Sequence, residues 1–132
     1  MKYLLDTCVV SDYIKGQANT RAKLLSCMPS ETAISTVTLF EIHYGLERNP
    51  AIALKIKPIL QSLIEVMTVL PFTEKTALHA GSLRAYLQQQ GTPIGSYDIL
   101  IAATATTENL ILVTSNLGEF SRVPTIQLEN WR

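Results

Sequence analysis

The amino-acid sequence predicts an α/β protein with a mostly parallel sheet that is covered by helices. Short apolar runs alternate along the chain with longer stretches of helical periodicity, which is typical of βαβ units. One run, Leu110–Val113, is apolar at every position, as expected of a strand that helices cover on both faces. The 132 residues contain no repeat, linker or low-complexity tract, so we expect a single domain over residues 1–132.

Five segments are the candidate strands. Each is a short run rich in apolar and β-branched residues, the types that fit a pleated and covered surface. In chain order they are Tyr3–Leu5, Ala33–Thr36, Val66–Leu70, Leu110–Thr114 and Thr125–Leu128.

Helices are expected between these strands. Leu39–Leu46 carries apolar residues on one stripe of a helix. Thr73–Gln90 follows Pro71 and precedes Gly91, which matches the start and stop signals of helices. Asp98–Glu108 carries small residues that can pack tightly against a sheet.

The sequence does not decide whether the segment Ala51–Glu65 forms one helix. Asn49 and Pro50 are a good cap and a good first position for a helix, but Pro58 would kink the helix or split it.

Composition favours a compact globular protein, with 47% apolar and 17% charged residues. The formal net charge is zero, so a broad basic surface is absent, and RNA binding would require a local basic cluster or a second subunit. Cys8 and Cys27 lack a metal-ligand spacing and predict no disulfide framework. We therefore expect a reduced, cytoplasmic protein with two small buried thiols.

No segment approaches the roughly 20 apolar residues that a membrane span requires. The apolar run at Met1–Leu5 ends at Asp6, too soon for the core of a signal peptide. No membrane association is expected.

The acidic residues carry the functional information. Asp6 follows the first predicted strand, Glu41 lies in the first turn of the helix after the second strand, and Asp98 opens the helix before the fourth strand. Asn116 and Glu119 follow the fourth strand. Ligands of open α/β sheets bind outside the carboxyl ends of the strands, so we expect these five side chains around one crevice.

Carboxylates that meet without Lys or Arg partners repel one another, and they persist when some ionise poorly or when a hard cation neutralises them. Mg²⁺ and Mn²⁺ prefer such oxygen ligands. On a phosphodiester, such a cation lowers the pKa of the attacking water and neutralises charge on the leaving oxygen. In-line attack by that water would leave a 5′-phosphate and a 3′-hydroxyl.

Each acid also has a purely structural interpretation. Glu41 lies three residues after Thr38, a capping-box spacing. Asp98 and Glu119 would each favour the dipole of a nearby helix. Asp6 is harder to explain in this way, because an Asp that ends a strand requires a partner.

Four stretches match the sequence pattern of a known family: Leu4–Ser11, Ile34–Gly45, Pro93–Ala103 and Leu112–Pro124, the last followed by Glu129-Asn130-Trp131. Together they extend over nearly the whole chain. The sequence therefore resembles the PIN-domain ribonucleases, and within them the VapC-type toxins of type II toxin–antitoxin systems.

The resemblance implies an α/β, PIN-like fold, with a parallel five-stranded sheet and helices on both faces of the sheet. It implies an endoribonuclease activity that requires Mg²⁺ or Mn²⁺. It also implies a homodimer and a cognate VapB-like antitoxin whose C-terminal segment wraps the toxin. The RNA would be tRNA or another structured RNA, and its cleavage would arrest translation.

By position, the resemblance makes Asp6, Glu41 and Asp98 the acidic triad. Asn116 stands where many relatives have a fourth Asp, and Glu119 supplies a nearby acid. We expect Asp6 and Asp98 to ligate the metal, with Glu41 as a third ligand or as an acceptor for a bound water.

Other residues are expected to support the site. Thr7 and Thr114 would orient Asp6 through hydroxyl hydrogen bonds. Arg84, which shares a helix face with Gln88, is a candidate RNA contact, although a solvated helix face is the better supported interpretation.

The sequence departs from the family pattern at two positions. Cys8 replaces the more common Asn and removes an amide near the site, and Gly118 stands where related sequences often carry Arg. Phe40, Tyr44 and Leu46 are expected to form an apolar patch for a second subunit or for the antitoxin.

Two other functions compete with the ribonuclease interpretation. An aspartyl-phosphate phosphatase would need a second Asp two positions after Asp6, and that position is Cys8, so this enzyme class is disfavoured. A binding module that retains the fold without cleavage is the main alternative, although no acid of the triad is missing.

Overall fold

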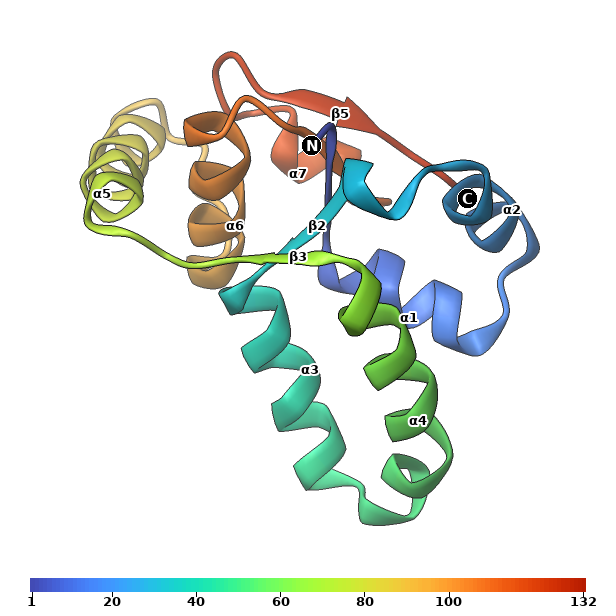
Figure 1. Ribbon diagram of the computed structural model, residues 1–132. Helices are drawn as coiled ribbons and strands as arrows, with labels where there is room; N and C mark the ends of the chain where they lie inside the picture. Colours follow the sequence, from blue (N-terminus) through green and yellow to red (C-terminus); the bar gives the residue numbers. More distant parts are fainter.

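The computed structural model describes all 132 residues. One sheet contains every strand, all neighbouring strands are parallel, and the strand order is β3-β2-β1-β4-β5 (Figure 1). The strands are β1 (Tyr3–Leu5), β2 (Thr32–Ser35), β3 (Thr68–Leu70), β4 (Ile111–Val113) and β5 (Gln127–Glu129). The predicted fold class is confirmed.

Seven α-helices connect the strands. They are α1 (Thr7–Lys15), α2 (Ala18–Ser26), α3 (Thr36–Arg48), α4 (Pro50–Val66), α5 (Glu74–Gln89), α6 (Ser96–Thr107) and α7 (Leu117–Phe120), and a short 3₁₀ turn, η1 (Pro29–Glu31), precedes β2. None of these helices is long and apolar enough to cross a bilayer.

The three central strands, β2, β1 and β4, bury both of their faces, as their apolar runs predict. Leu4 pairs with Ala33 on one side and with Leu112 on the other, and all three belong to one core cluster. Their neighbours along each strand, such as Leu5 and Val113, belong to a second cluster on the opposite face. This alternation is the period-two geometry of a strand.

Helices α5, α6 and α7 cover the first face of the sheet. The small residues Ala102, Ala103 and Ala105 of α6 are fully buried there, together with Phe120 of α7. Because these alanines have short side chains, α6 can lie close to the sheet, as the sequence predicts. Helix α5 packs outside α6, farther from the strands (Figure 1).

Helices α1, α2 and α4 contribute the buried residues of the second face, including Val10, Leu24 and Leu63. Helices α3 and α4 form a hairpin that projects from the carboxyl edge of the sheet (Figure 1). Helix α4 continues through Pro58. A proline cannot donate to the carbonyl four residues earlier, at Leu54, and this residue is 82% exposed, so water can satisfy that carbonyl.

Helices α1 and α2 are absent from the elements that the sequence predicts. The limits of α1 are nevertheless encoded locally: Asp6 caps its start, and Gly16 ends it with φ of +83°. Both cysteines are free, as expected, but Cys8 and Cys27 are half-buried where the sequence analysis expected buried thiols.

Several element boundaries differ from prediction. Val66 ends α4 and does not start β3, and α3 begins at Thr36, three residues before Leu39. Strand β5 begins at Gln127 because Thr125 has φ of +65°, which is incompatible with an extended strand.

Candidate active site

The carboxyl ends of β1 and β4 meet at a reversal of strand order. From β1 the chain continues to β2 on one side, and it later reaches β4 on the other side of β1. Such a switch point is where open α/β sheets bind their ligands. Asp6 follows β1 here, and Thr114 follows β4.

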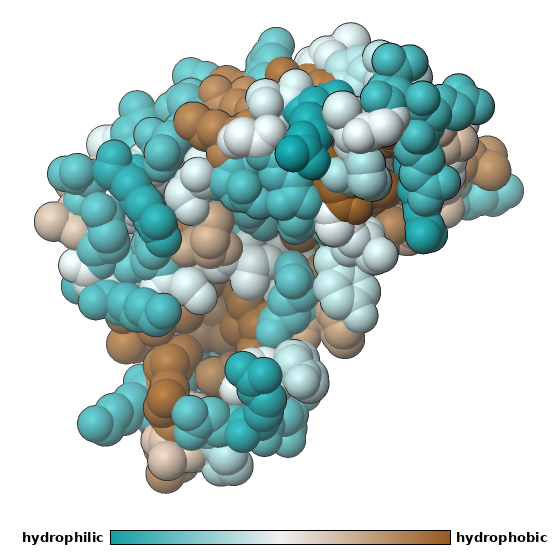
Figure 2. Space-filling view, turned by 180° about the vertical axis from the view of Figure 1, so that it is seen from behind, coloured by the Kyte–Doolittle hydropathy of each residue, from teal (hydrophilic) through white to brown (hydrophobic).

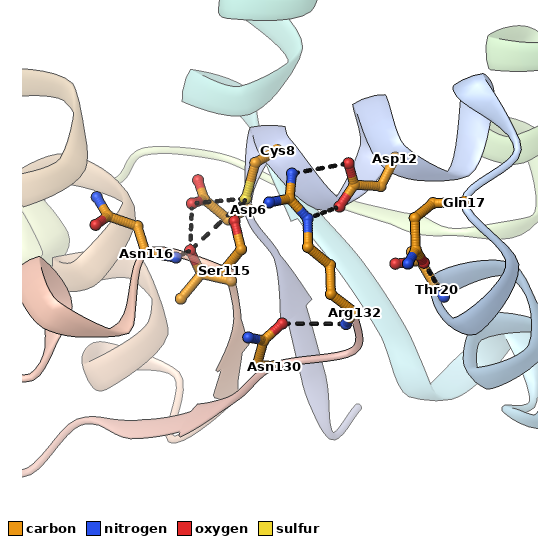
Figure 3. Close-up of polar contacts among 10 residues, drawn as sticks. Asp6, Cys8, Asp12, Gln17, Thr20, Ser115, Asn116, Asn130 and Arg132 are labelled. Atoms are coloured by element: carbon orange, nitrogen blue, oxygen red, sulfur yellow. Dashed lines mark hydrogen bonds and ion pairs between the residues drawn. The ribbon is translucent and has the colours of Figure 1, made fainter.

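Asp6 is buried and held at both carboxylate oxygens. Its Oδ1 accepts a hydrogen bond from the Thr7 backbone N–H at 2.8 Å, and its Oδ2 accepts one from the Thr114 hydroxyl at 2.8 Å. Cys8 Sγ also contacts Oδ2, at 3.6 Å (Figure 3). Burial raises the pKa of Asp6, and these hydrogen bonds oppose the rise.

Glu41 lies in the second turn of α3 and does not cap it. Ser35 caps the helix by accepting from the Thr38 backbone N–H, so the capping-box interpretation of Glu41 is wrong. The Thr7 hydroxyl donates to Glu41 Oε1 at 2.6 Å. The prediction that this hydroxyl orients Asp6 is therefore also wrong, because Thr7 reaches Asp6 through its backbone instead.

Glu119 is fixed by two donors. The Gly95 backbone N–H donates to its Oε1, and the Asn116 side chain donates to its Oε2, both at 2.7 Å. These bonds lower the pKa of Glu119. The Asn116 backbone N–H donates to the Thr114 hydroxyl, which itself donates to Asp6, so Asn116 supports two carboxylates.

Asp98 lies in the first turn of α6, and no hydrogen bond is formed by its carboxylate. Partial burial and the negative charges of Asp6, Glu119 and Glu41 raise the pKa of Asp98 to about 6. The four carboxylates are therefore close enough to repel one another, and no Lys or Arg forms a salt bridge with any of them.

The third aspartate, Asp12, lies outside this acidic cluster of Asp6, Glu41, Asp98 and Glu119. It is buried on α1 and accepts two hydrogen bonds from the Arg132 guanidinium, at 2.8 and 3.0 Å (Figure 3). Its charge is therefore balanced within the fold.

A divalent cation fits the donor chemistry of the acidic cluster. As the side chains lie, no three acidic, histidine or cysteine residues converge as ligands of one ion. Mg²⁺ is usually bound by only one or two carboxylates, with water in its remaining positions. The unpaired Asp98 and the fixed Asp6 meet that requirement.

Gly95 is a residue of the site that the sequence analysis missed. A Cβ at this position would lie 3.3 Å from Asp98 Oδ2 and 3.6 Å from Glu119 Oε1, so the missing side chain leaves room for both carboxylates. Gly95 comes three residues before Asp98, just ahead of a predicted helix. This position is the feature of the sequence that could have identified Gly95 as part of the site. Ser115, which donates to Cys8 Sγ, was missed as well.

The other candidate residues make no hydrogen bond to the carboxylates of the acidic cluster. Arg84 is exposed on α5 and makes no salt bridge or side-chain hydrogen bond. Gly118 is exposed on α7 with open space around it. Leu46 is partly buried against the second core cluster and does not join the expected surface patch, whereas Phe40 and Tyr44 are exposed.

The PIN domain family model matches residues 3–126. The chain belongs to the PIN-domain family. This PIN-domain protein is 35% identical over 131 residues to the tRNA(fMet)-specific endonuclease VapC of Salmonella typhimurium. It is 36% identical to ribonuclease VapC2 of Haemophilus influenzae, and each alignment covers 99% of this chain and 98% of the relative. The chain is therefore a PIN-domain protein of the VapC type.

Solved structures agree with this assignment. The protein matches the DNA-bound VapBC of Salmonella typhimurium with a TM-score of 0.91 and 35% identity, over 100% of this chain and 99% of that chain. It matches VapBC2 of Rickettsia felis, bound to a promoter DNA fragment, with a TM-score of 0.89 and 32% identity over all of both chains.

Proposed function

We propose that this PIN-domain protein, acting as a single domain over residues 1–132, is an endoribonuclease that requires Mg²⁺ or Mn²⁺. The observation that carries the proposal is the acidic cluster at the switch point, in which four carboxylates lie together and none forms a salt bridge. A fold that needed these acids only for stability would pair them, as it pairs Asp12 with Arg132.

Asp6 and Asp98 would hold the cation. When bound, the cation neutralises charge on the scissile phosphate and lowers the pKa of a water molecule. Asp6 is positioned for this role by Thr7 and Thr114, and the Asp98 side chain can reorient because its carboxylate forms no hydrogen bond.

Glu41 and Glu119 flank the two metal-binding residues. Glu41, held by Thr7, would act as a third ligand or accept a hydrogen bond from the attacking water. Gly95 and Asn116 donate to Glu119 and lower its pKa, which suits this carboxylate to orienting a second water more than to accepting a proton. Attack in line with the leaving oxygen would yield a 5′-phosphate and a 3′-hydroxyl.

The substrate would be tRNA or another structured RNA, and its cleavage would arrest translation. The Salmonella relative is named for its specificity toward tRNA(fMet), which supports a tRNA. Arg84 stays a candidate phosphate contact.

A VapB-like antitoxin and a second copy of the chain are the proposed protein partners. Apolar surface gathers where the α3–α4 hairpin meets the rest of the molecule (Figure 2). A hollow of about 500 Å³ between α2 and α4 has mostly apolar walls, including Leu25 and Val66, which are 74% and 55% exposed. Such a groove suits the apolar face of a partner segment.

Cleavage of total RNA tests the proposed activity. The purified protein should cut RNA with Mg²⁺ or Mn²⁺ and lose the activity in EDTA, and the fragments should carry 5′-phosphates. A protein that binds RNA but leaves it intact with either metal would instead be a binding module with the PIN fold.

Gly95→Ala should lower the cleavage rate about ten- to a hundredfold, because small displacements of catalytic groups have effects of this size. The new methyl group would contact Asp98 and Glu119, while the backbone at this position, with φ of −57°, suits alanine. Gly81→Ala is the matched control, since Gly81 lies on α5 with nothing within 4 Å of its Cβ position. Equal rates for Gly95→Ala and the parent would mean that the methyl group does not disturb the reactive carboxylates.

A further inference from the structure

Three exposed aromatic side chains surround the opening beside Glu41. Phe40 and Tyr44 lie one turn apart on α3, and Tyr97 lies in the first turn of α6. The Phe40 and Tyr97 rings meet edge to face with centroids 5.3 Å apart. Half or more of each residue is exposed: 50% for Phe40, 57% for Tyr44 and 50% for Tyr97.

This aromatic cluster, Phe40, Tyr44 and Tyr97, is contiguous with the acidic cluster. Phe40 precedes Glu41 in the chain, and Tyr97 precedes Asp98. The three rings line a hollow of about 470 Å³ together with Thr7 and Glu41. The edge-to-face contact joins the start of α6 to α3, which lie next to each other (Figure 1).

The carboxylate of Glu41 in the wall of this hollow argues against an apolar protein partner. Glu41 is held by a single hydrogen bond from Thr7, so a partner that sealed the hollow with apolar groups would strand a carboxylate away from water. A nucleotide avoids this cost, because its base can cover the rings while its phosphate and associated cation face the acids.

Charge explains why aromatic rings are useful at this place. The chain has no net charge, and four acids face the phosphate, so electrostatic attraction cannot supply the affinity here. Arg48, whose guanidinium lies 5.4 Å from the centroid of the Tyr44 ring, is the one cation in contact with the aromatic cluster. Stacking of a base on an aromatic ring contributes about 1–3 kcal/mol and does not depend on charge.

We propose that Phe40, Tyr44 and Tyr97 form a stacking subsite for an unpaired nucleobase next to the scissile phosphate. The inference rests on the proposed ribonuclease function and adds to it the residues that would hold the nucleotide beside the bond that is cleaved. A base within a helix keeps both of its faces stacked on its neighbours, so only a loop or bulge can present one to the rings.

The test is RNA binding with Ca²⁺ in place of Mg²⁺ or Mn²⁺, since Ca²⁺ takes the same oxygen ligands. Binding is measured by fluorescence anisotropy with two labelled probes: an RNA hairpin with an unpaired loop, and the same loop sequence closed as a duplex. Phe40→Ala and Tyr97→Ala should each weaken hairpin binding roughly 5- to 100-fold. Tyr97→Phe should bind like the parent, whereas Tyr97→Leu, which keeps apolar bulk without a ring, should not. Tyr86→Ala, at an exposed tyrosine of α5, is the matched control and should have no effect.

Salt dependence gives a second readout. The loss caused by Tyr97→Ala should be the same at low and high salt, because no phosphate contact is removed, while Arg48→Gln should reduce the salt dependence of binding. Duplex binding should be unchanged in all the aromatic variants.

Several results would overturn the subsite: hairpin binding by Tyr97→Ala and Phe40→Ala at the affinity of the parent, equal losses on hairpin and duplex, or failure of the parent to bind the hairpin. Conversion of a dimeric parent to a monomer by these variants, seen by sedimentation, would instead assign the rings to a subunit interface. If the parent cuts RNA and the aromatic variants cut and bind it equally well, only the subsite is wrong. If the parent does not cut RNA with any divalent metal, the ribonuclease proposal fails.

Discussion

Asp98→Asn should lower RNA cleavage by about 10³-fold, or about 4 kcal/mol of transition-state stabilisation, while the protein stays folded. Asparagine keeps the shape of the side chain and the helix start, but it removes a negative charge from the proposed cation site. The Asp98 carboxylate accepts no hydrogen bond in the fold, so its neutralisation leaves no partner unsatisfied.

The matched control is Glu74→Gln, which removes a first-turn acid from α5 in the same way. Cleavage should be unaffected by that change. If Asp98→Asn cut RNA at the rate of the parent, Asp98 would be a helix-dipole residue and its assignment to the reaction would be wrong.

Expression of the chain without an antitoxin should stop bacterial growth, and Asp6→Asn should abolish the arrest. Asp6 is the most tightly held carboxylate of the cluster, and asparagine can still accept from the Thr7 N–H and donate to the Thr114 hydroxyl. The change therefore removes charge more than structure. Growth is measured as colony counts after induction.

Asp12→Asn is the control for this experiment, because it neutralises the other buried aspartate without touching the acidic cluster. Cells that express it should stop growing like those with the parent, provided that immunoblots show equal protein levels. Arrest by Asp6→Asn at equal levels would point to toxicity by binding and away from cleavage.

The sequence predicts the strands of the sheet well because the pattern that identifies each strand lies within a few consecutive residues. Every predicted strand is found, since a run such as Leu110–Val113 is apolar on both alternating faces wherever it occurs in a covered sheet. Helix α1 is not predicted because its apolar stripe is too short to show helical periodicity, and because Asp6 is first interpreted as the residue that ends a strand. Its role as the helix cap becomes evident only with the chain folded.

The membership of the acidic cluster is predictable from the order of the strands, but its hydrogen bonds are not. Parallel strands bring Asp6 and Asp98 to one edge whatever their partners are. Which hydroxyl reaches which carboxylate depends on side-chain geometry between distant segments. Thr7 therefore holds Glu41 and not Asp6 with its hydroxyl, and Gly95 fixes Glu119 through a backbone N–H that the sequence cannot reveal.

The pKa of Asp98 links the acidic cluster to stability. Its folded pKa of about 6 lies above the value in the unfolded chain, so the folded state binds more protons between the two values. The resulting destabilisation is absent below the unfolded pKa, grows as pH rises from that value to about 6, and is complete above it. Allowing for the partial exposure of the group, Asp98→Asn should raise stability at neutral pH in EDTA by about 1 kcal/mol, or roughly 3–5 °C in Tm.

Thermal melting of the parent and Asp98→Asn, with Mn²⁺ or with EDTA, tests the metal site most directly. At neutral pH, Mn²⁺ should raise the Tm of the parent by several degrees, because a ligand at about 100 times its Kd contributes about 2.7 kcal/mol. The gain should shrink below pH about 6, where Asp98 is protonated, and should nearly vanish in Asp98→Asn. The opposite result would be a parent Tm that does not change with Mn²⁺ and an Asp98→Asn protein whose Tm in EDTA is below that of the parent. That result would show that these carboxylates stabilise the fold and bind no cation.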